Sequence, residues 1–332
     1  MHFHLTEEQA AIQDAVRGTL AENWPMERLH AFSESDADFD PQSWQALMAL
    51  GLGGILLPDS GMGLLDAALA SQIAGEAAAP GPLIGQMLAV HAVAHSANPA
   101  VAAFLDDLVE GVAVATLALD GSDYVQSANT ARFFLTGSRN GPLELVEAGA
   151  GVTITPMPST DRSRPLASVT FDGAVTHQLF AAGDPFVARV FDAALVLVAA
   201  DALGGAQKCT DMSVAYAQQR EQFGQPIGRF QALKHQLAQM ALDVEPAHAF
   251  VWYAAYAWDA QLPDAARAAA MAKAHLADVF VRCTRAAVGA HGGIGYTWEY
   301  GLNYWFRRAI LDRAWLGSPG EHRARAAQMA GW

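Results

Sequence analysis

Hydrophobic residues recur at helical spacing through the first third of the chain. One apolar stripe consists of Leu5, Ile12, Val16 and Leu20. Thr6 and Gln9 have the spacing of a capping box, which would begin this helix. A linker containing Pro80 and Pro82 interrupts the helical pattern before it resumes. We therefore predict an N-terminal helical domain over residues 1–111.

The pattern changes after this region to short apolar runs separated by Gly, Ser, Asn and Pro. These runs are VAVATLAL, ARFFLTG, GVTITPM and ASVTFDG. They are typical of a small antiparallel sheet or barrel, which we place in residues 112–184. Helical periodicity returns after Pro185 and continues to the end, which predicts a C-terminal helical domain over residues 185–332. The expected fold class is mainly α with a small β domain.

An arginine lies where one C-terminal helix breaks and the next begins. The helix before Arg220 is predicted to end near Gln219, and Phe230, Leu233, Leu237 and Met240 mark the next one. Gly224 between them can take a positive φ. The planar guanidinium of Arg220 suits bidentate binding of a phosphate or pyrophosphate. An ordinary surface arginine at a helix turn is the alternative interpretation.

A second segment, from Val288 to Ala309, reads VGAHGGIGYTWEYGLNYWFRRA and favours the first interpretation. Together with YAQQREQFGQPIGRFQALKHQLAQM, Tyr216 to Met240, it resembles the C-terminal domain of the acyl-CoA dehydrogenases. These flavoenzymes desaturate CoA thioesters. The resemblance extends to WQALMALGLGGILLPDSGMGLLDAAL in the N-terminal part. It implies N-terminal helices, a middle antiparallel β domain and a C-terminal four-helix bundle.

The resemblance also implies contacts to FAD across a subunit interface. In the family, the arginine of RxxFG and the glycines of the HGG segment reach the flavin held mainly by a neighbouring subunit. The matching positions here are Arg220, Phe223, Gly224, Gln231, Gly292 and Gly293. A glutamine usual in the family three residues before the first of these paired glycines is Gly289, which weakens one contact.

No carboxylate stands at either base position that the resemblance indicates. The family's C-terminal glutamate aligns with Gly317, and the alternative position early in the first helix of the domain aligns with Ala194. Asp192 and Asp201 lie nearby, but helical rotation turns each to a different face from Ala194. Glu321 aligns instead with a family position that contacts the flavin. We predict that this chain has no catalytic base of its own.

The middle domain departs from the family as well. The family's flavin-ring loop is shortened here to Ala118-Leu119-Asp120-Gly121-Ser122-Asp123. Its Trp-Ile-Thr strand is replaced by LTGSRNGP, from Leu135 to Pro142. Only the remnant Gly121-Ser122-Asp123 matches. We expect that this reduced domain cannot form a complete flavin site alone.

These matches and losses suggest half of a site. The leading hypothesis is a non-catalytic subunit of an α2β2 acyl-CoA dehydrogenase, with a longer catalytic partner and an acyl-CoA substrate. Short degenerate subunits of this kind resemble those that act on CoA-activated steroid side chains. Two alternatives are a self-sufficient homo-oligomeric flavoenzyme with an unrecognised base, and a non-enzymatic acyl-CoA-binding scaffold.

Composition limits the other function classes. The 332 residues are 52% hydrophobic, which suits a large core, and the net charge of −14 with no Lys/Arg cluster in the sequence argues against nucleic acid. No apolar run has the length of a membrane span, and MHFHLTEEQ lacks the features of a signal peptide. Cys209 and Cys283 suit a reducing compartment, so we expect a cytoplasmic protein.

His91 and His95 are four residues apart on a predicted helix, a spacing that can bind metal. There is no HExxH glutamate and no obvious third ligand, so we interpret them as helix-surface histidines and predict no metal site. In GSPGEH, Ser318 and His322 lie close in sequence, but the GxSxG elbow of a hydrolase is absent.

Overall fold

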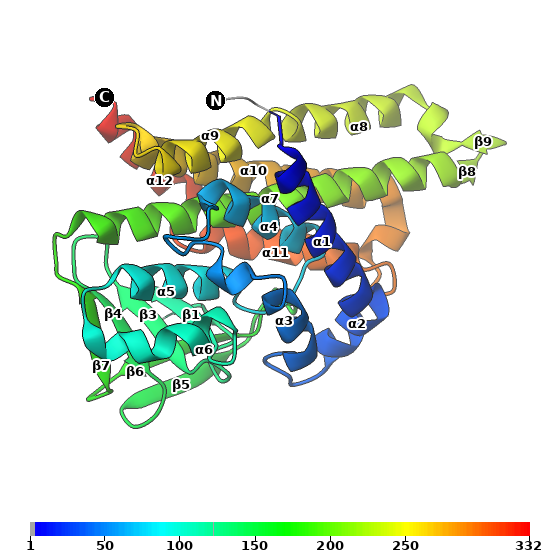
Figure 1. Cartoon of the computed structure of the whole chain (residues 1–332). Coiled ribbons are helices and arrows are strands. Elements are labelled where there is room, and N and C mark those ends of the chain that lie inside the picture. Colours follow the sequence, from blue (N-terminus) through cyan, green and yellow to red (C-terminus); the bar gives the residue numbers. More distant parts are fainter. Residues whose placement is uncertain (1–3, 122) are drawn as a thin grey trace.

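The computed structural model describes residues 4–121 and 123–332 and has a helix, sheet, helix order (Figure 1). The N-terminal helices are α1 (Glu7–Asn23), α2 (Met26–Glu34), α3 (Pro41–Met48), α4 (Leu64–Glu76), α5 (Leu83–His95) and α6 (Leu105–Val109). Short 3-10 turns, η1 (Leu52–Gly54) and η2 (Pro99–Phe104), connect some of them. The mainly α fold class is confirmed.

The start of α1 confirms the predicted capping box. Gln9 N donates to Thr6 Oγ1 at 3.1 Å, and Thr6 N donates to Gln9 Oε1 at 3.1 Å. Val16 and Leu20 from the predicted stripe are buried. Because a cap depends on neighbours three residues away, the sequence alone contains the information for it.

The middle region contains two small sheets with orders β1-β3-β4-β7 and β2-β6-β5. The strands are β1 (Ala115–Leu119), β2 (Val125–Gln126), β3 (Phe133–Gly137), β4 (Leu143–Glu147), β5 (Val152–Met157), β6 (Leu166–Phe171) and β7 (Thr176–Phe180). The expected purely antiparallel arrangement was wrong at one pair, because β1 and β3 are parallel. The chain between them passes through β2 in the other sheet and returns in the original direction.

The C-terminal helices are α7 (Pro185–Gln219), α8 (Gln231–Val244), α9 (Ala247–Asp259), α10 (Ala265–His291), α11 (Leu302–Ala314) and α12 (Pro319–Met329). Helices α7 to α10 pack against one another, and α11 and α12 pack on α10. No helix in the described residues combines the length and apolar character needed to cross a membrane.

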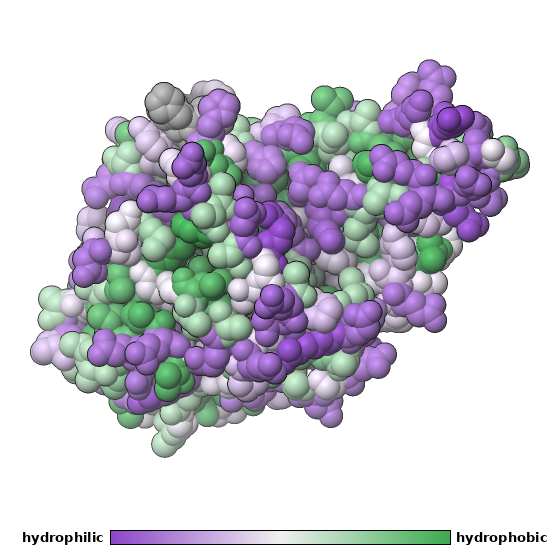
Figure 2. All heavy atoms as spheres, turned by 45° about the vertical axis from the view of Figure 1, so that its right-hand side comes forward, coloured by the Kyte–Doolittle hydropathy of each residue, from purple (hydrophilic) through white to green (hydrophobic). Residues whose placement is uncertain are grey.

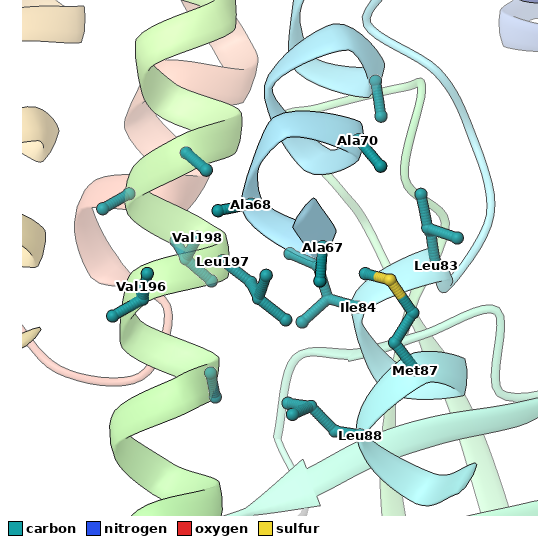
Figure 3. Close-up of a cluster of buried hydrophobic side chains, with 14 of the residues drawn as sticks. Ala67, Ala68, Ala70, Leu83, Ile84, Met87, Leu88, Val196, Leu197 and Val198 are labelled. Atoms are coloured by element: carbon teal, nitrogen blue, oxygen red, sulfur yellow. The ribbon is translucent and has the colours of Figure 1, made fainter. Parts of the chain in front are cut away.

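The N-terminal and C-terminal helices share one core, in which α4 and α5 meet α7 (Figure 3). Glycines allow α4 and α7 to approach closely. A Cβ on Gly75 would lie 2.1 Å from Asp201 O, and one on Gly204 would lie 1.8 Å from Gln72 O. Any larger residue at either position would force these helices apart.

Candidate functional site

An arm formed by residues 220–231 projects beyond the packed helices at the end of α7 (Figure 1). Its strands β8 (Glu221–Gln222) and β9 (Gln225–Pro226) form a hairpin, followed by η3 (Ile227–Arg229). Arg220 caps α7, its N–H donating to Tyr216 O at 2.8 Å, and its carbonyl accepts from Ile227 N at 2.8 Å. Hydrophilic residues dominate this projecting end of the molecule in Figure 2.

The hairpin turn holds an aromatic side chain in solvent. Phe223 has φ +56° and Gly224 has φ +76°, which is the pattern of a two-residue type I′ turn. Left-handed backbone is unfavourable for phenylalanine by roughly 1–2 kcal/mol. Phe223 is nevertheless 92% exposed, and its ring makes a T-shaped contact with Phe230. A strained, exposed aromatic residue is a feature of contact sites more than of isolated surfaces.

The side chain of Arg220 is exposed and forms no ion pair with any described residue. Gln231 begins α8, where Phe230 is the N-cap and offers no capping side chain. The N–H groups of the first turn of α8 therefore remain available to an anion. The arm thus presents a free guanidinium and a helix N-terminus, both of which suit a pyrophosphate.

The glycine pair lies beside the root of the arm. Helix α10 ends at His291, its C-cap Gly292 has φ +64°, and both Gly292 and Gly293 belong to η4 (Gly292–Tyr296). A Cβ on either glycine would meet no atom within 4 Å, so the space beside this backbone is open and a ligand could approach it closely. The ring of Tyr216 stacks on His291 with centroids 4.5 Å apart. This contact joins the helix turn before Arg220 to the residue before the glycines.

Both positions aligned with a family base lack space for a carboxylate. Ala194 is fully buried within α7. Gly317 has φ +101°, and a Cβ there would lie 2.9 Å from His322 Nε2. His322 Nε2 is fixed by donating to Leu316 O at 2.9 Å, and burial lowers the pKa of His322 to about 4.

Glu321 and Ser318 have a local structural role. Ser318 N donates to Glu321 Oε2 at 2.7 Å, and Glu321 N donates to Ser318 Oγ at 3.3 Å. These bonds form the capping box of α12, and the N–H of Ser318 lowers the pKa of the Glu321 carboxyl. Ser318 and His322 serve as cap and buried donor, so the arrangement does not provide a hydrolytic pair.

A clamp formed by Arg139, Asp192 and Arg325 connects the β3–β4 turn with α7 and α12. Arg139 Nη1 donates to Asp192 Oδ1 at 2.9 Å, and Arg325 Nη2 donates to the same oxygen at 2.8 Å. Arg139 belongs to the segment that replaces the family's Trp-Ile-Thr strand, and Asp192 precedes Ala194 by two residues. The clamp ties the middle domain to α7 and α12.

A buried charge network lies farther along α7. Arg308 donates to Asp201 through Nε at 2.9 Å and Nη2 at 2.5 Å, and Arg164 Nη2 donates to Asp201 at 2.6 Å. Arg164 also binds Asp312. Burial opposes ionisation of Asp201, yet the two guanidinium groups hold its pKa well below the usual value. Burial raises the pKa of Asp312 to about 7.

Sequence reasoning missed the clamp and this network. Their members come from separate elements, and no spacing in the sequence joins them.

In the loop remnant, Asp123 accepts a hydrogen bond from Ser168 Oγ at 2.8 Å, and Gly121 has φ +132°. Ser122 lies outside the described residues.

The prediction that both histidines of HAVAH lie on the surface was wrong for His91. His91 is 6% exposed because its ring, on α5, packs against the rings of Phe186 and Trp258. Its Nδ1 donates to Leu56 O at 3.0 Å, and burial lowers its pKa to about 4. No group of three or more potential metal ligands occurs in residues 4–121 and 123–332.

Solved structures with the same architecture define the class of fold. One chain of the ChsE4-ChsE5 complex from Mycobacterium tuberculosis has a TM-score of 0.91 at 23% identity, covering 100% of this chain and 99% of that chain. Butyryl-CoA dehydrogenase from Megasphaera elsdenii has a TM-score of 0.89 at 22% identity, with 100% of both chains covered. The fold is that of an acyl-CoA dehydrogenase.

Sequence comparison then establishes the family. Residues 6–111 match the model "Acyl-CoA dehydrogenase, N-terminal domain" and residues 183–330 match "Acyl-CoA dehydrogenase, C-terminal domain". The chain is 31% identical over 326 residues to the acyl-CoA dehydrogenase IpdE2 of Mycolicibacterium smegmatis, covering 97% of this chain and 98% of that protein. The chain belongs to the acyl-CoA dehydrogenase family of flavin-dependent oxidoreductases.

One further structural neighbour is named for a substrate class. A chain of the "Tcur3481-Tcur3483 steroid ACAD G363A variant" has a TM-score of 0.88 at 25% identity, covering 98% of both chains. Its name, like that of the ChsE4-ChsE5 complex, contains two different polypeptides.

Proposed function

We propose that this chain is the base-lacking subunit of a heteromeric acyl-CoA dehydrogenase. The observation that carries the proposal is the contrast between the two halves of the site. The arm and the glycine pair are exposed and unpartnered, whereas the base positions are a buried alanine and a glycine with no room for a side chain. Such a chain can contact a cofactor but cannot remove a proton from a substrate.

FAD, held mainly by a longer catalytic partner, would supply the hydride acceptor for desaturation of the CoA thioester. This chain's part would be to grip the cofactor across the interface. The contacting residues would be Arg220, Phe223, Gly224, Gln231, Gly292 and Gly293. Arg220 would bind the pyrophosphate through charge-assisted hydrogen bonds. The exposed glycines would allow close approach, and Phe223 would exclude water from the contact.

The size of the rate contribution from a general base favours a site shared between two subunits over an independent active site. A positioned general base contributes about 10²–10⁴ in rate, equivalent to roughly 3–5 kcal/mol of barrier. Neither Asp192 nor Asp201 is available to supply it, since both are bound by arginines in buried surroundings. The partner subunit would therefore provide the carboxylate as well as most of the flavin site.

The proposed assembly is an α2β2 heterotetramer. Its support is the heteromeric composition named for two structural neighbours. A polycyclic, steroid-derived acyl group is the proposed substrate class, because one of these neighbours is named as a steroid acyl-CoA dehydrogenase. We place the assembly in the cytoplasm, where the buried thiols of Cys209 and Cys283 would stay reduced.

The arm can be tested by Arg220→Ala in the co-purified complex. Loss of a charge-assisted hydrogen bond costs about 1.5–3 kcal/mol, so flavin affinity should fall at least about tenfold. Flavin content after dialysis at limiting FAD measures this change. Arg229→Ala removes the same charge from the same arm at another exposed position and serves as the control. Equal flavin retention in both variants would refute the cross-subunit contact.

A further inference from the structure

A cavity of about 530 Å³ lies next to the glycine pair, between the end of α10, η4 and α11. Arg285, Tyr296, Trp298, Asn303 and Arg307 are among the residues that line it. Its volume is in the range of small-molecule and cofactor sites. None of the six FAD-contacting positions assigned to the arm and glycine pair is among its lining residues.

The cavity carries an uncompensated positive charge. Arg285 and Arg307 line it, and Arg162 lies beside it. The guanidinium groups of Arg162 and Arg307 lie 4.9 Å and 4.8 Å from the ring centroid of Trp298. No described residue forms an ion pair with any of the three, and no acidic residue lines the cavity. In a chain with net charge −14, such a cluster is suited to a polyanion.

The cavity also offers groups that recognise a planar heterocycle. Tyr296 is 79% exposed, so its ring is accessible for stacking, whereas the ring of Trp298 is already in contact with Arg162 and Arg307. Asn303 Oδ1 is buried and has no hydrogen-bond partner among the described residues. A buried acceptor without a partner is costly, and an exocyclic amine of a nucleobase would satisfy it.

We propose that this cavity binds the adenosine 3′-phosphate 5′-diphosphate moiety of a CoA thioester, an inference that rests on the proposed role in acyl-CoA dehydrogenation. Three arginines match the three phosphate groups of that moiety. The ring of Tyr296 stacks on adenine, and Asn303 Oδ1 accepts from its amine. The diphosphate of FAD lacks the third phosphate and already has a separate candidate partner in Arg220.

The test is a calorimetric titration of the co-purified complex, once with free CoA and once with 3′-dephospho-CoA. Arg285→Ala should weaken CoA binding at least about tenfold, because a charge-assisted contact is lost. The wild-type complex should bind 3′-dephospho-CoA more weakly than CoA. Arg282→Ala is the matched control, since Arg282 lies one turn earlier on α10 and pairs with Asp243 at 3.1 Å instead. It should leave CoA affinity unchanged.

A second pair of variants tests the aromatic contact. Loss of one stacking partner costs about 1–3 kcal/mol per base, so Tyr296→Leu should weaken CoA binding at least about fivefold. Trp332→Leu removes an exposed tryptophan outside the cavity and should have no effect.

Two results would overturn the inference. One is equal CoA affinity in Arg285→Ala and Arg282→Ala. The other is loss of bound FAD from Arg285→Ala with CoA affinity unchanged, which would assign the cavity to the flavin nucleotide. The proposed function is tested separately by the flavin content of Arg220→Ala. Normal flavin in that variant, together with weakened CoA binding in Arg285→Ala, would reject the arm contact and keep the CoA site.

Discussion

Gly317 and Ala194, where the resemblance places a catalytic base, leave no room for a carboxylate for two different reasons. Ala194 has no space around it because α7 is buried there. Gly317 has a left-handed backbone, φ +101°, and its carbonyl accepts from Lys273 Nζ at 3.3 Å. Restoring a carboxylate at Gly317 therefore requires more than a change of side chain.

We expect Gly317→Glu to give no dehydrogenase activity in the isolated chain and to lower its stability. The left-handed conformation costs a non-glycine residue roughly 1–2 kcal/mol, and the new Cβ would press on His322. Gly317→Ala is the control for this backbone cost. Thermal unfolding should place both variants below wild type by a similar amount. Desaturation by the lone Gly317→Glu chain would show that a complete flavin site exists within it.

His91 gives a prediction for the pH dependence of stability. Its pKa is about 4 in the folded chain, against an ordinary value of 6.5, because burial disfavours the cation. Between these values the unfolded chain binds more protons, so the free energy of unfolding rises with pH. The contribution is complete above pH 6.5 and is lost as the pH falls towards 4, in total up to about 3 kcal/mol.

The measurement is urea unfolding at several pH values in this window. His91→Phe should flatten the pH dependence, whatever its effect on absolute stability. His235→Ala, at an exposed position on α8, is the control and should leave the slope as in wild type. An unchanged slope in His91→Phe would mean that other groups account for the acid sensitivity.

At the scale of elements, α11 joins the C-terminal helices to the rest of the molecule through buried charges. Arg308 binds Asp201 on α7 and donates to Ala79 O, after α4, at 3.1 Å. Arg164 brings the β5–β6 loop into the same cluster. These ionic contacts hold together elements that hydrophobic packing alone would leave less specifically oriented.

Arg308→Ala should destabilise the chain by about 3–5 kcal/mol, because it leaves Asp201 buried without one of its two arginines. Arg313→Ala, on the same helix, breaks an exposed pair with Asp278 at 3.1 Å and should cost at most about 1 kcal/mol. Urea unfolding of both variants compares these costs. Similar small losses would show that the buried network contributes little.

Local elements were the predictable part of the fold. The capping box at Thr6 and the break of α7 near Arg220 depend on residues close in sequence, and both are present. The parallel pairing of β1 and β3 and the burial of His91 depend on contacts made by distant segments. The arginines around Trp298 likewise form a cluster only after folding, because Arg162 and Arg307 are far apart in the sequence.

The site residues divide in the same way. The resemblance in sequence pointed to the arm and the glycine pair, and it predicted that a catalytic carboxylate is missing. The clamp of Arg139, Asp192 and Arg325 could not be inferred, because its members come from β3–β4, α7 and α12. The clamp joins the middle domain to the two helices through one shared carboxylate oxygen.

Within the whole molecule, the exposed arm and glycine pair occur together with Ala194 and Gly317, which leave no room for a carboxylate. The arm and the glycines lie at one end of α7, whereas the clamp lies near its other end (Figure 1). An assembly in which this end meets a second subunit would use the exposed groups and leave the clamp intact.

The most direct test is to purify the chain alone and with the product of its neighbouring gene, and to record the visible flavin spectrum, the subunit ratio and acyl-CoA desaturation for each. The lone chain should have little flavin and little activity, and a complex with equal amounts of the two subunits should have both. A lone chain that is yellow, carries stoichiometric flavin and desaturates a CoA thioester would contradict it.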